Sequence, residues 1–237
     1  GSSTPDAIGD EEFLQYAGFG SVVYNGQSYD EVNVNSNGYL VLGPVTSEDD
    51  VCCPPQASPD SAPPNNVIAP FWSDLAGDTG TPEGEEPLGV YGALFSDDST
   101  GATYLVLETR LTDCCKGDDV HGTTKVAEVW FRLDGPQEIS IDYPADAKPD
   151  TSGIEQAPGD PLATVVVQNE AGDGDQYDLA DPLPSDFFVV STDPIPGDSY
   201  TVSLDVKGVT SGGGSLTSEV TSPQVKGTTI VRTGISV

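Results

Sequence analysis

Basic residues are scarce in this chain of 237 residues. Eight lysines and arginines stand against 39 aspartates and glutamates, giving a formal net charge of −31 at pH 7. Such a surface repels the phosphates of nucleic acids and anionic lipids, so nucleic-acid binding is excluded as a function. No apolar run approaches the roughly 20 residues of a membrane-spanning helix, and we expect no membrane insertion. The acidic surface fits a saline medium, calcium capture, or ordinary solvation of the fold.

Residues that commonly carry catalysis are also few. His121, the only histidine, lies in the polar segment DDVHGTT. A Ser-His-Asp triad would require it, yet the sequence has no GxSxG nucleophile turn. It also has no glycine-rich phosphate loop and no carboxylate pair marked by an apolar setting. We predict that the protein has no catalytic residues and is not an enzyme.

The four cysteines form two adjacent pairs, Cys52-Cys53 and Cys114-Cys115. The lack of CxxC spacing argues against zinc binding and against a thioredoxin-type redox motif. Four cysteines allow three disulfide connectivities, and we favour the two that join the loops over the one that joins neighbouring cysteines. Disulfides between subunits stay open as an alternative. Each of these patterns indicates an oxidising compartment.

Short β-rich runs separated by turn residues dominate residues 1–193. This pattern predicts an all-β fold, an antiparallel, jelly-roll-like β-sandwich. Asn37-Gly38 is a strong hairpin signal, and the runs with consecutive apolar residues are expected to be covered on both faces. The exception is DEEFLQYA (10–17), for which we predict a short helical turn. The predicted strands are 21–24, 31–35, 39–43, 67–72, 90–95, 103–111, 125–133, 138–143, 163–169 and 187–191.

Residues 194–237 differ from this body, since their three basic and three acidic residues cancel. We interpret them as a second region, a neutral β tail that extends the sandwich by two strands, YTVSLDV (200–206) and TTIVRTGISV (228–237). SGGGS (211–215) is expected to be a flexible link. The terminal strand must pair within its own sheet or complete the sheet of a neighbouring molecule. Its candidate assembly residues are Ile230, Val231, Ile235 and Val237.

Two glycine-rich acidic loops are candidate calcium sites, because carboxylate and carbonyl oxygens suit that ion. FWSDLAGDTG offers Asp74 and Asp78, and NEAGDGDQYD offers Asp173 and Asp175. In the alternative interpretation these acids are solvated, and Asp74 holds the turn after its strand by accepting hydrogen bonds from backbone amides. No cofactor is required in either case.

The segments VYNGQSYDEVNVNSNGYLVLG (23–43) and NNVIAPFWSDL (65–75) together resemble the nidogen-like (NIDO-like) extracellular domain. The resemblance spans roughly residues 18–192 and is closer to versions appended to secreted bacterial subtilisin-like proteases. It implies a secreted β module without catalytic residues, used in adhesion, matrix or accessory roles. The chain has no protease domain, and its paired cysteines have no counterpart in the family pattern.

Three functions follow from these features. The first is a secreted structural protein whose copies polymerise into an extracellular filament or surface layer through β-strand addition. The second is a cell-surface adhesion or calcium-binding module, and the third is an accessory C-terminal domain of a secreted protease. The neutral tail behind an acidic body favours the first, in which the partner is a copy of the same chain.

Overall fold

The structure is a computed structural model, and the chain divides into two compact units, Gly1–Thr192 and Asp193–Val237. For Asp175, Tyr177, Asp178 and strands β12, β13 and β14 only the backbone is described. The residues described are 4–51, 55–56, 58–77, 81, 86–114, 124–133, 135, 137–144, 149, 163–178, 186–189, 213–221 and 228–236.

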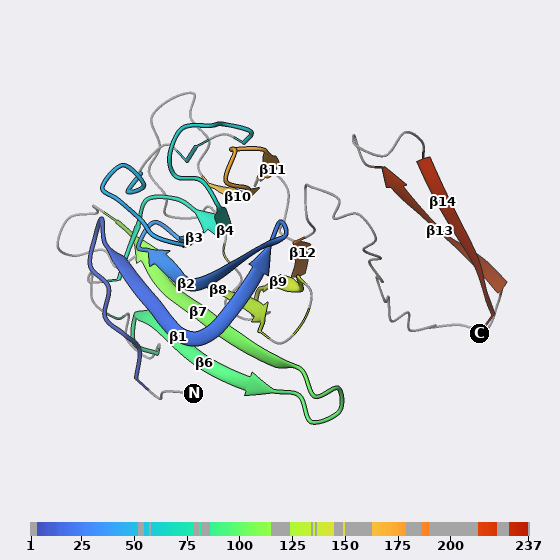
Figure 1. The fold of residues 1–237 in the computed structure, drawn as a ribbon, viewed down its shortest axis with the longest axis horizontal. Helices are drawn as coiled ribbons and strands as arrows, with labels where there is room; N and C mark the ends of the chain where they lie inside the picture. The colour runs from blue at the N-terminus through green and yellow to red at the C-terminus, as the bar shows by residue number, and fades with distance from the viewer. Residues whose placement is uncertain are drawn as a thin grey trace. The chain divides into compact units, whose positions relative to one another are not determined.

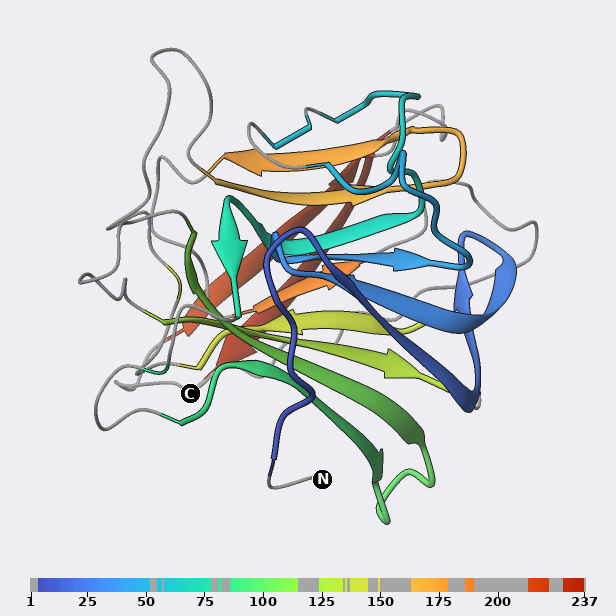
Figure 2. The ribbon, with the colours of Figure 1, turned by 90° about the vertical axis from the view of Figure 1, so that its left-hand side faces the viewer.

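Two antiparallel sheets pack together in the first unit, and the described residues include no helix (Figures 1 and 2). One sheet has the order β1-β2-β3-β4-β10-β11, and the other has the order β12-β9-β8-β7-β5, with β6 also pairing with β7. This arrangement confirms the predicted all-β sandwich. The strands are β1 (Phe13–Tyr24), β2 (Gln27–Asn35), β3 (Tyr39–Leu42), β4 (Val67–Trp72), β5 (Leu75–Ala76), β6 (Gly89–Ser96), β7 (Thr103–Asp113), β8 (Lys125–Arg132), β9 (Ile139–Asp142), β10 (Thr164–Gln168), β11 (Gly174–Asp178) and β12 (Asp186–Val189).

The predicted helical turn at residues 10–17 is wrong, because β1 begins at Phe13. Leu14 and Tyr16 alternate along the strand and pack against the core. The acids before this segment resemble the start of a helix. Pairing with β2, which sets Leu14 opposite Val34 and buries every second residue, outweighs that local signal. A two-residue turn, Asn25-Gly26, connects β1 to β2 with φ of 49° and 76°. Two successive positive φ values are typical of the type I′ hairpin turn that Asn-Gly favours.

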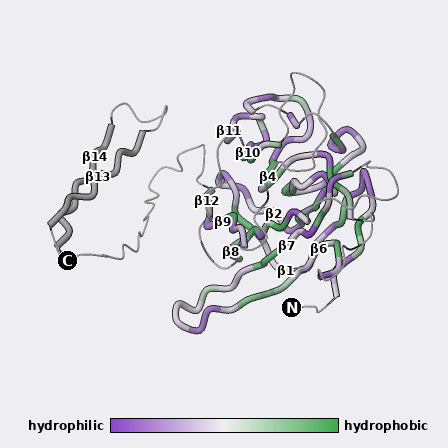
Figure 3. Tube along the Cα trace, turned by 180° about the vertical axis from the view of Figure 1, so that it is seen from behind, coloured by the Kyte–Doolittle hydropathy of each residue, from purple (hydrophilic) through white to green (hydrophobic). Residues whose placement is uncertain are grey.

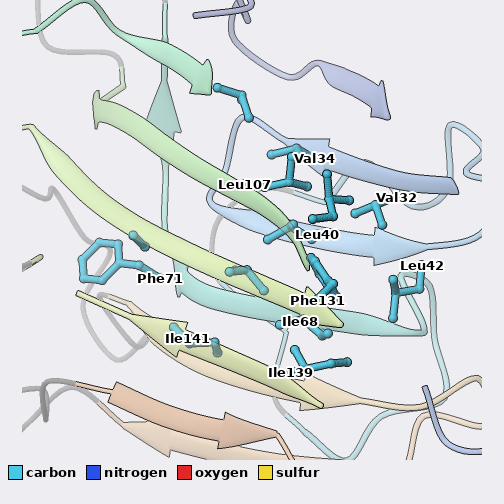
Figure 4. Close-up of a cluster of buried hydrophobic side chains, with 14 of the residues drawn as sticks. Val32, Val34, Leu40, Leu42, Ile68, Phe71, Leu107, Phe131, Ile139 and Ile141 are labelled. Atoms are coloured by element: carbon cyan, nitrogen blue, oxygen red, sulfur yellow. The ribbon is translucent and has the colours of Figure 1, made fainter. Parts of the chain in front are cut away.

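The main core lies between the two sheets (Figure 4). Val34, Leu40 and Ile68 contribute from the first sheet, and Leu107 and Phe131 from the second. A smaller apolar cluster covers the other face of the first sheet. Strands β3 and β4 are therefore buried at every position, as the consecutive apolar runs predict. That second cluster consists of Tyr39, Val41, Val67, Ala69, Trp72 and Val166, with Phe13, Val45 and Val51 packed against it.

A register shift in β4 decides which face of the sheet each of its two aromatic residues takes. Opposite β10, Ala69 pairs with Val166 and Trp72 pairs with Thr164, so β4 has one extra residue around Pro70. This bulge reverses the alternation of the strand. Phe71 consequently joins the core between the sheets, and Trp72 joins the second cluster.

The second unit contains one antiparallel hairpin, β13 (Gly213–Thr221) with β14 (Thr228–Ser236). The predicted strand 228–237 agrees with β14, whereas SGGGS, expected to be a link, contributes its last three residues to β13. The predicted strand 200–206 and Val237 lie outside the described residues.

The register of the hairpin divides the predicted assembly residues between its two faces. Strict pairing from Gly213–Ser236 to Thr221–Thr228 puts Val231 and Ile235 on one face and Ile230 on the other. The first of these faces collects the larger apolar residues of both strands, which are Leu216, Val220, Val231 and Ile235.

Candidate functional site

The structure places three of the four candidate metal residues, Asp74, Asp173 and Asp175. Asp74 lies between β4 and β5, and Asp78 lies outside the described residues. Asp173 is exposed in the tight turn between β10 and β11, where its backbone N–H donates to the side-chain oxygen of Asn169 at 3.0 Å. Asp175 lies in β11 opposite Val167. The NEAGDGDQYD segment is thus a hairpin turn followed by a strand.

Other acidic residues gather around Asp74. Ligand atoms of Asp10, Asp74 and Cys114 lie within 4.8 Å of one another. Asp10 precedes β1 and Cys114 follows β7, so three segments far apart in the sequence meet here. Two backbone hydrogen bonds fix this meeting. Cys114 N–H donates to the Asp74 carbonyl oxygen at 3.0 Å, and Gly77 N–H donates to the Gly9 carbonyl oxygen at 3.2 Å.

The turn between β2 and β3 supports the segment that carries Asp74. The backbone carbonyl of Asn37 accepts a hydrogen bond of 3.1 Å from Ser73 N–H, and its side-chain oxygen accepts one of 3.3 Å from Leu75 N–H. Asn37 is completely buried. It therefore has the turn-fixing role that the sequence pattern suggested for Asp74.

The electrostatics of this acidic cluster are unfavourable for its carboxylates. Burial raises the pKa of Asp74, and the neighbouring carboxylates of Asp10 and Asp113 raise it further. Burial also raises the pKa of Glu11, followed by the charge of Asp50, while a hydrogen bond from Asn37 lowers it. One carboxylate oxygen of Asp74 is buried without a hydrogen-bond partner. A cation placed among these oxygens would relieve both the repulsion and the lost hydration.

The chemistry of the cluster favours a hard cation over a thiolate-binding metal. Cys114 is disulfide-bonded, so its sulfur is no thiolate ligand. The remaining donors are carboxylate and carbonyl oxygens, which suit calcium. Cys52, Cys53, Cys115 and His121 lie outside the described residues, and the pairing of the four cysteines stays a prediction.

Sequence reasoning identified Asp74 in this acidic cluster but missed Asp10, Glu11 and Asp113. No spacing rule links these positions, because the sandwich brings them together from the start of β1 and the end of β7. The one available signal was indirect. An acid that follows an apolar strand, as Asp113 follows TYLVLETRL, lies at a sheet end where other strand ends can meet.

The two antiparallel sheets, with acids at several strand ends, define the architecture of an all-β sandwich module. Residues 6–87 match the model of a family described as NIDO related. This match confirms the nidogen-like resemblance for the part of the chain from the segment before β1 through β5. Nidogen-like domains are typically extracellular. No curated protein and no solved structure matches the chain. The described part contains no helix able to cross a membrane.

Proposed function

We propose that this is a secreted, non-enzymatic structural protein whose copies assemble into an extracellular filament or surface layer by β-strand addition. The observation that carries the proposal is the β13–β14 hairpin. It forms a two-stranded sheet in its own compact unit, and neither outer edge is paired among the described residues. Unpaired edges present rows of backbone donors and acceptors that a further strand can satisfy.

A two-stranded sheet is marginally stable in water, because it lacks the third strand or packed layer that would cover an apolar face. Pairing with an edge strand of another copy would supply that layer. When the donor and the acceptor are different surfaces, each copy can give one contact and receive another. Such head-to-tail contacts generate a filament when the rotation between successive copies does not close into a ring.

The charge distribution agrees with this function. Residues 194–237 carry no net charge, so the whole −31 belongs to residues 1–193. Two acidic bodies repel each other, whereas a neutral hairpin can approach a second body without that cost. Secretion is supported by the nidogen-like match and by the disulfide at Cys114, which suits an oxidising compartment.

The test compares the full chain with a chain that lacks residues 213–237. We expect light scattering and electron microscopy to show concentration-dependent polymers for the full chain and monomers for the shortened one. Near-UV circular dichroism should be the same for both chains, because residues 213–237 contain no aromatic residue, and an unchanged spectrum establishes that the body is intact. Polymers of equal length from the shortened chain would refute the donor role of the hairpin.

A calcium-dependent adhesion module is the second candidate, favoured by the acidic cluster around Asp74. The carboxyl group of Asp74 has a raised pKa and a buried oxygen without a hydrogen-bond partner. Extracellular calcium sites commonly bind in the range of about 10⁻⁴–10⁻³ M, so about 5 mM Ca²⁺ would saturate one. We expect a higher melting temperature in Ca²⁺ than in chelator at equal ionic strength. An unchanged melting temperature would remove this candidate.

A further inference from the structure

The hairpin between β6 and β7 projects from the sandwich as an arm (residues 93–104; Figures 1 and 2). Both strands of this arm contain hydrophobic residues, and the turn at its tip is hydrophilic (Figure 3). The two exposed large hydrophobic residues of the described chain, Leu94 at 62% and Phe95 at 47% exposure, lie here in β6. Adjacent residues of a strand face opposite ways, so apolar surface is offered on both faces of the arm.

The arm is held in place by its own hydrogen bonds. At the tip, Asp97 accepts from Ser99 N–H at 2.8 Å and from the Thr100 hydroxyl at 2.7 Å. The pairing of β6 with β7 runs from Gly89–Arg110 to Ser96–Thr103 without a register shift. The exposed residues are therefore presented on a regular strand.

The outer edge of β6 is open beyond Val90. Val90 exchanges both backbone hydrogen bonds with Asp6, at 2.8 and 3.0 Å, so its N–H and carbonyl point away from β7. In a β-strand the N–H and carbonyl groups of every second residue point to the same side. Those of Gly92, Leu94 and Ser96 therefore point outward as well. No backbone partner for the groups of these three residues occurs in the described part of the chain.

Each of the other outer strands has a feature that discourages further pairing, and β6 has none. Strand β1 has a register shift between Ala17 and Val22, and β5 contains two residues. Strands β11 and β12 carry acidic residues. The β6 sequence GVYGALFS contains no charge, no proline and no bulge. Natural edge strands are commonly protected by these devices, and an edge that lacks all of them is suited to pairing.

We propose that the outer edge of β6, from Gly92 to Ser96, is the acceptor for the β13–β14 hairpin of a second copy. This inference rests on the proposed function and identifies the surface that it requires. Pairing of β14 with β6 would give the hairpin a third strand without unfolding it. The apolar face of the hairpin would extend the exposed apolar surface at Leu94. Strand β14 contains one arginine and no acid, so it approaches an acidic body without repulsion.

Photo-crosslinking tests the contact in the full chain. Benzoylphenylalanine replaces Phe95, and ¹⁴N- and ¹⁵N-labelled chains are mixed before irradiation. We expect crosslinks from position 95 to residues 228–236 that join differently labelled copies. Crosslinks only within one copy, or only to other segments, would overturn the proposal even when polymers form. If the wild-type chain stays monomeric at all concentrations, the proposed function fails as well, and light scattering shows this separately.

A proline at the edge gives an independent test. Leu94→Pro removes an outward N–H and leaves the bonds between β6 and β7 in place, because the Leu94 N–H does not take part in them. We expect the concentration needed for assembly to rise at least about tenfold, equivalent to about 1.4 kcal/mol. The matched control, Asp98→Pro, puts the same ring in the tip of the arm and should assemble like the wild type. Unimpaired assembly of Leu94→Pro at an unchanged melting temperature would overturn the acceptor role.

Discussion

The hydroxyl of Tyr143, directly after β9, donates a hydrogen bond of 2.5 Å to the carbonyl oxygen of Pro70 in the bulge of β4. The two residues belong to opposite sheets, and Tyr143 is almost completely buried. The contact therefore links the layers of the sandwich at the point where β4 changes its alternation. A buried carbonyl at a bulge needs such a partner, since water does not reach it.

Replacing this hydroxyl should weaken the fold. Tyr143→Phe keeps the ring but leaves the Pro70 carbonyl without its partner, which costs about 1–3 kcal/mol of the free energy of unfolding. Urea unfolding measures the difference. Tyr104→Phe is the control, because it removes an exposed hydroxyl that bonds to Glu138 at 2.8 Å. Its effect should stay within about 0.5 kcal/mol. Equal losses in both variants would contradict a special role for the Tyr143 contact.

Gly38 should tolerate no side chain, for two separable reasons. Its φ of 78° disfavours L-residues, and a Cβ atom would overlap the Phe71 carbonyl oxygen. Gly101 has nearly the same φ, 75°, and a Cβ atom added there would meet no other atom within 4 Å. Gly101→Ala should therefore cost about 1 kcal/mol, the conformational part alone. Gly38→Ala should cost clearly more in the same unfolding assay, and equal costs would contradict the close approach.

The sequence predicts most strands because their signals are local. Alternation and Asn-Gly turns identify β2 and β3. The errors arise where local chemistry competes with distant pairing. Acids before Leu14 imitate a helix start, and the glycines at the start of β13 resemble a linker. The acidic cluster around Asp74 depends on which strand ends meet, and that information is absent from any single segment.

Alkaline pH should unfold the protein through its buried tyrosines. Burial raises the pKa of Tyr24, Tyr39 and Tyr143 well above the value of about 10 in an unfolded chain. Their contribution to stability is fully present below about pH 10 and is lost as the pH rises toward the folded pKa values. The urea midpoint should fall steeply between about pH 10 and pH 12. Tyrosinate absorbance should follow unfolding, and ionisation of these residues in the folded protein would contradict the prediction.

Asp74→Asn should raise the melting temperature in calcium-free buffer at neutral pH. The pKa of Asp74 is raised, so the folded state favours its protonated form. This group therefore contributes stability below its unfolded pKa of about 4 and loses it as the pH rises. The difference between variant and wild type should shrink as the pH falls toward that value. Under the calcium hypothesis, the variant should also lose any stabilisation by Ca²⁺.

Asp98→Asn is the control for this experiment, since it removes one negative charge from an exposed position in the arm. If both variants raise the melting temperature equally, the effect reflects net charge and not the acidic cluster around Asp74. If Asp74→Asn is stabilised by Ca²⁺ as strongly as the wild type, calcium binds elsewhere.

Assembly should strengthen as salt concentration rises. The acidic bodies repel one another, and the screening length falls from about 10 Å at 0.1 M to about 3 Å at 1 M ionic strength. The contact proposed between β6 and the β13–β14 hairpin consists of backbone hydrogen bonds and apolar area, which NaCl does not screen. Light scattering should therefore show a lower assembly concentration at about 1 M NaCl, with chelator present to separate this effect from calcium. If ion pairs to Arg232 held the copies together, salt would weaken assembly instead, and that result would contradict strand addition through an uncharged edge.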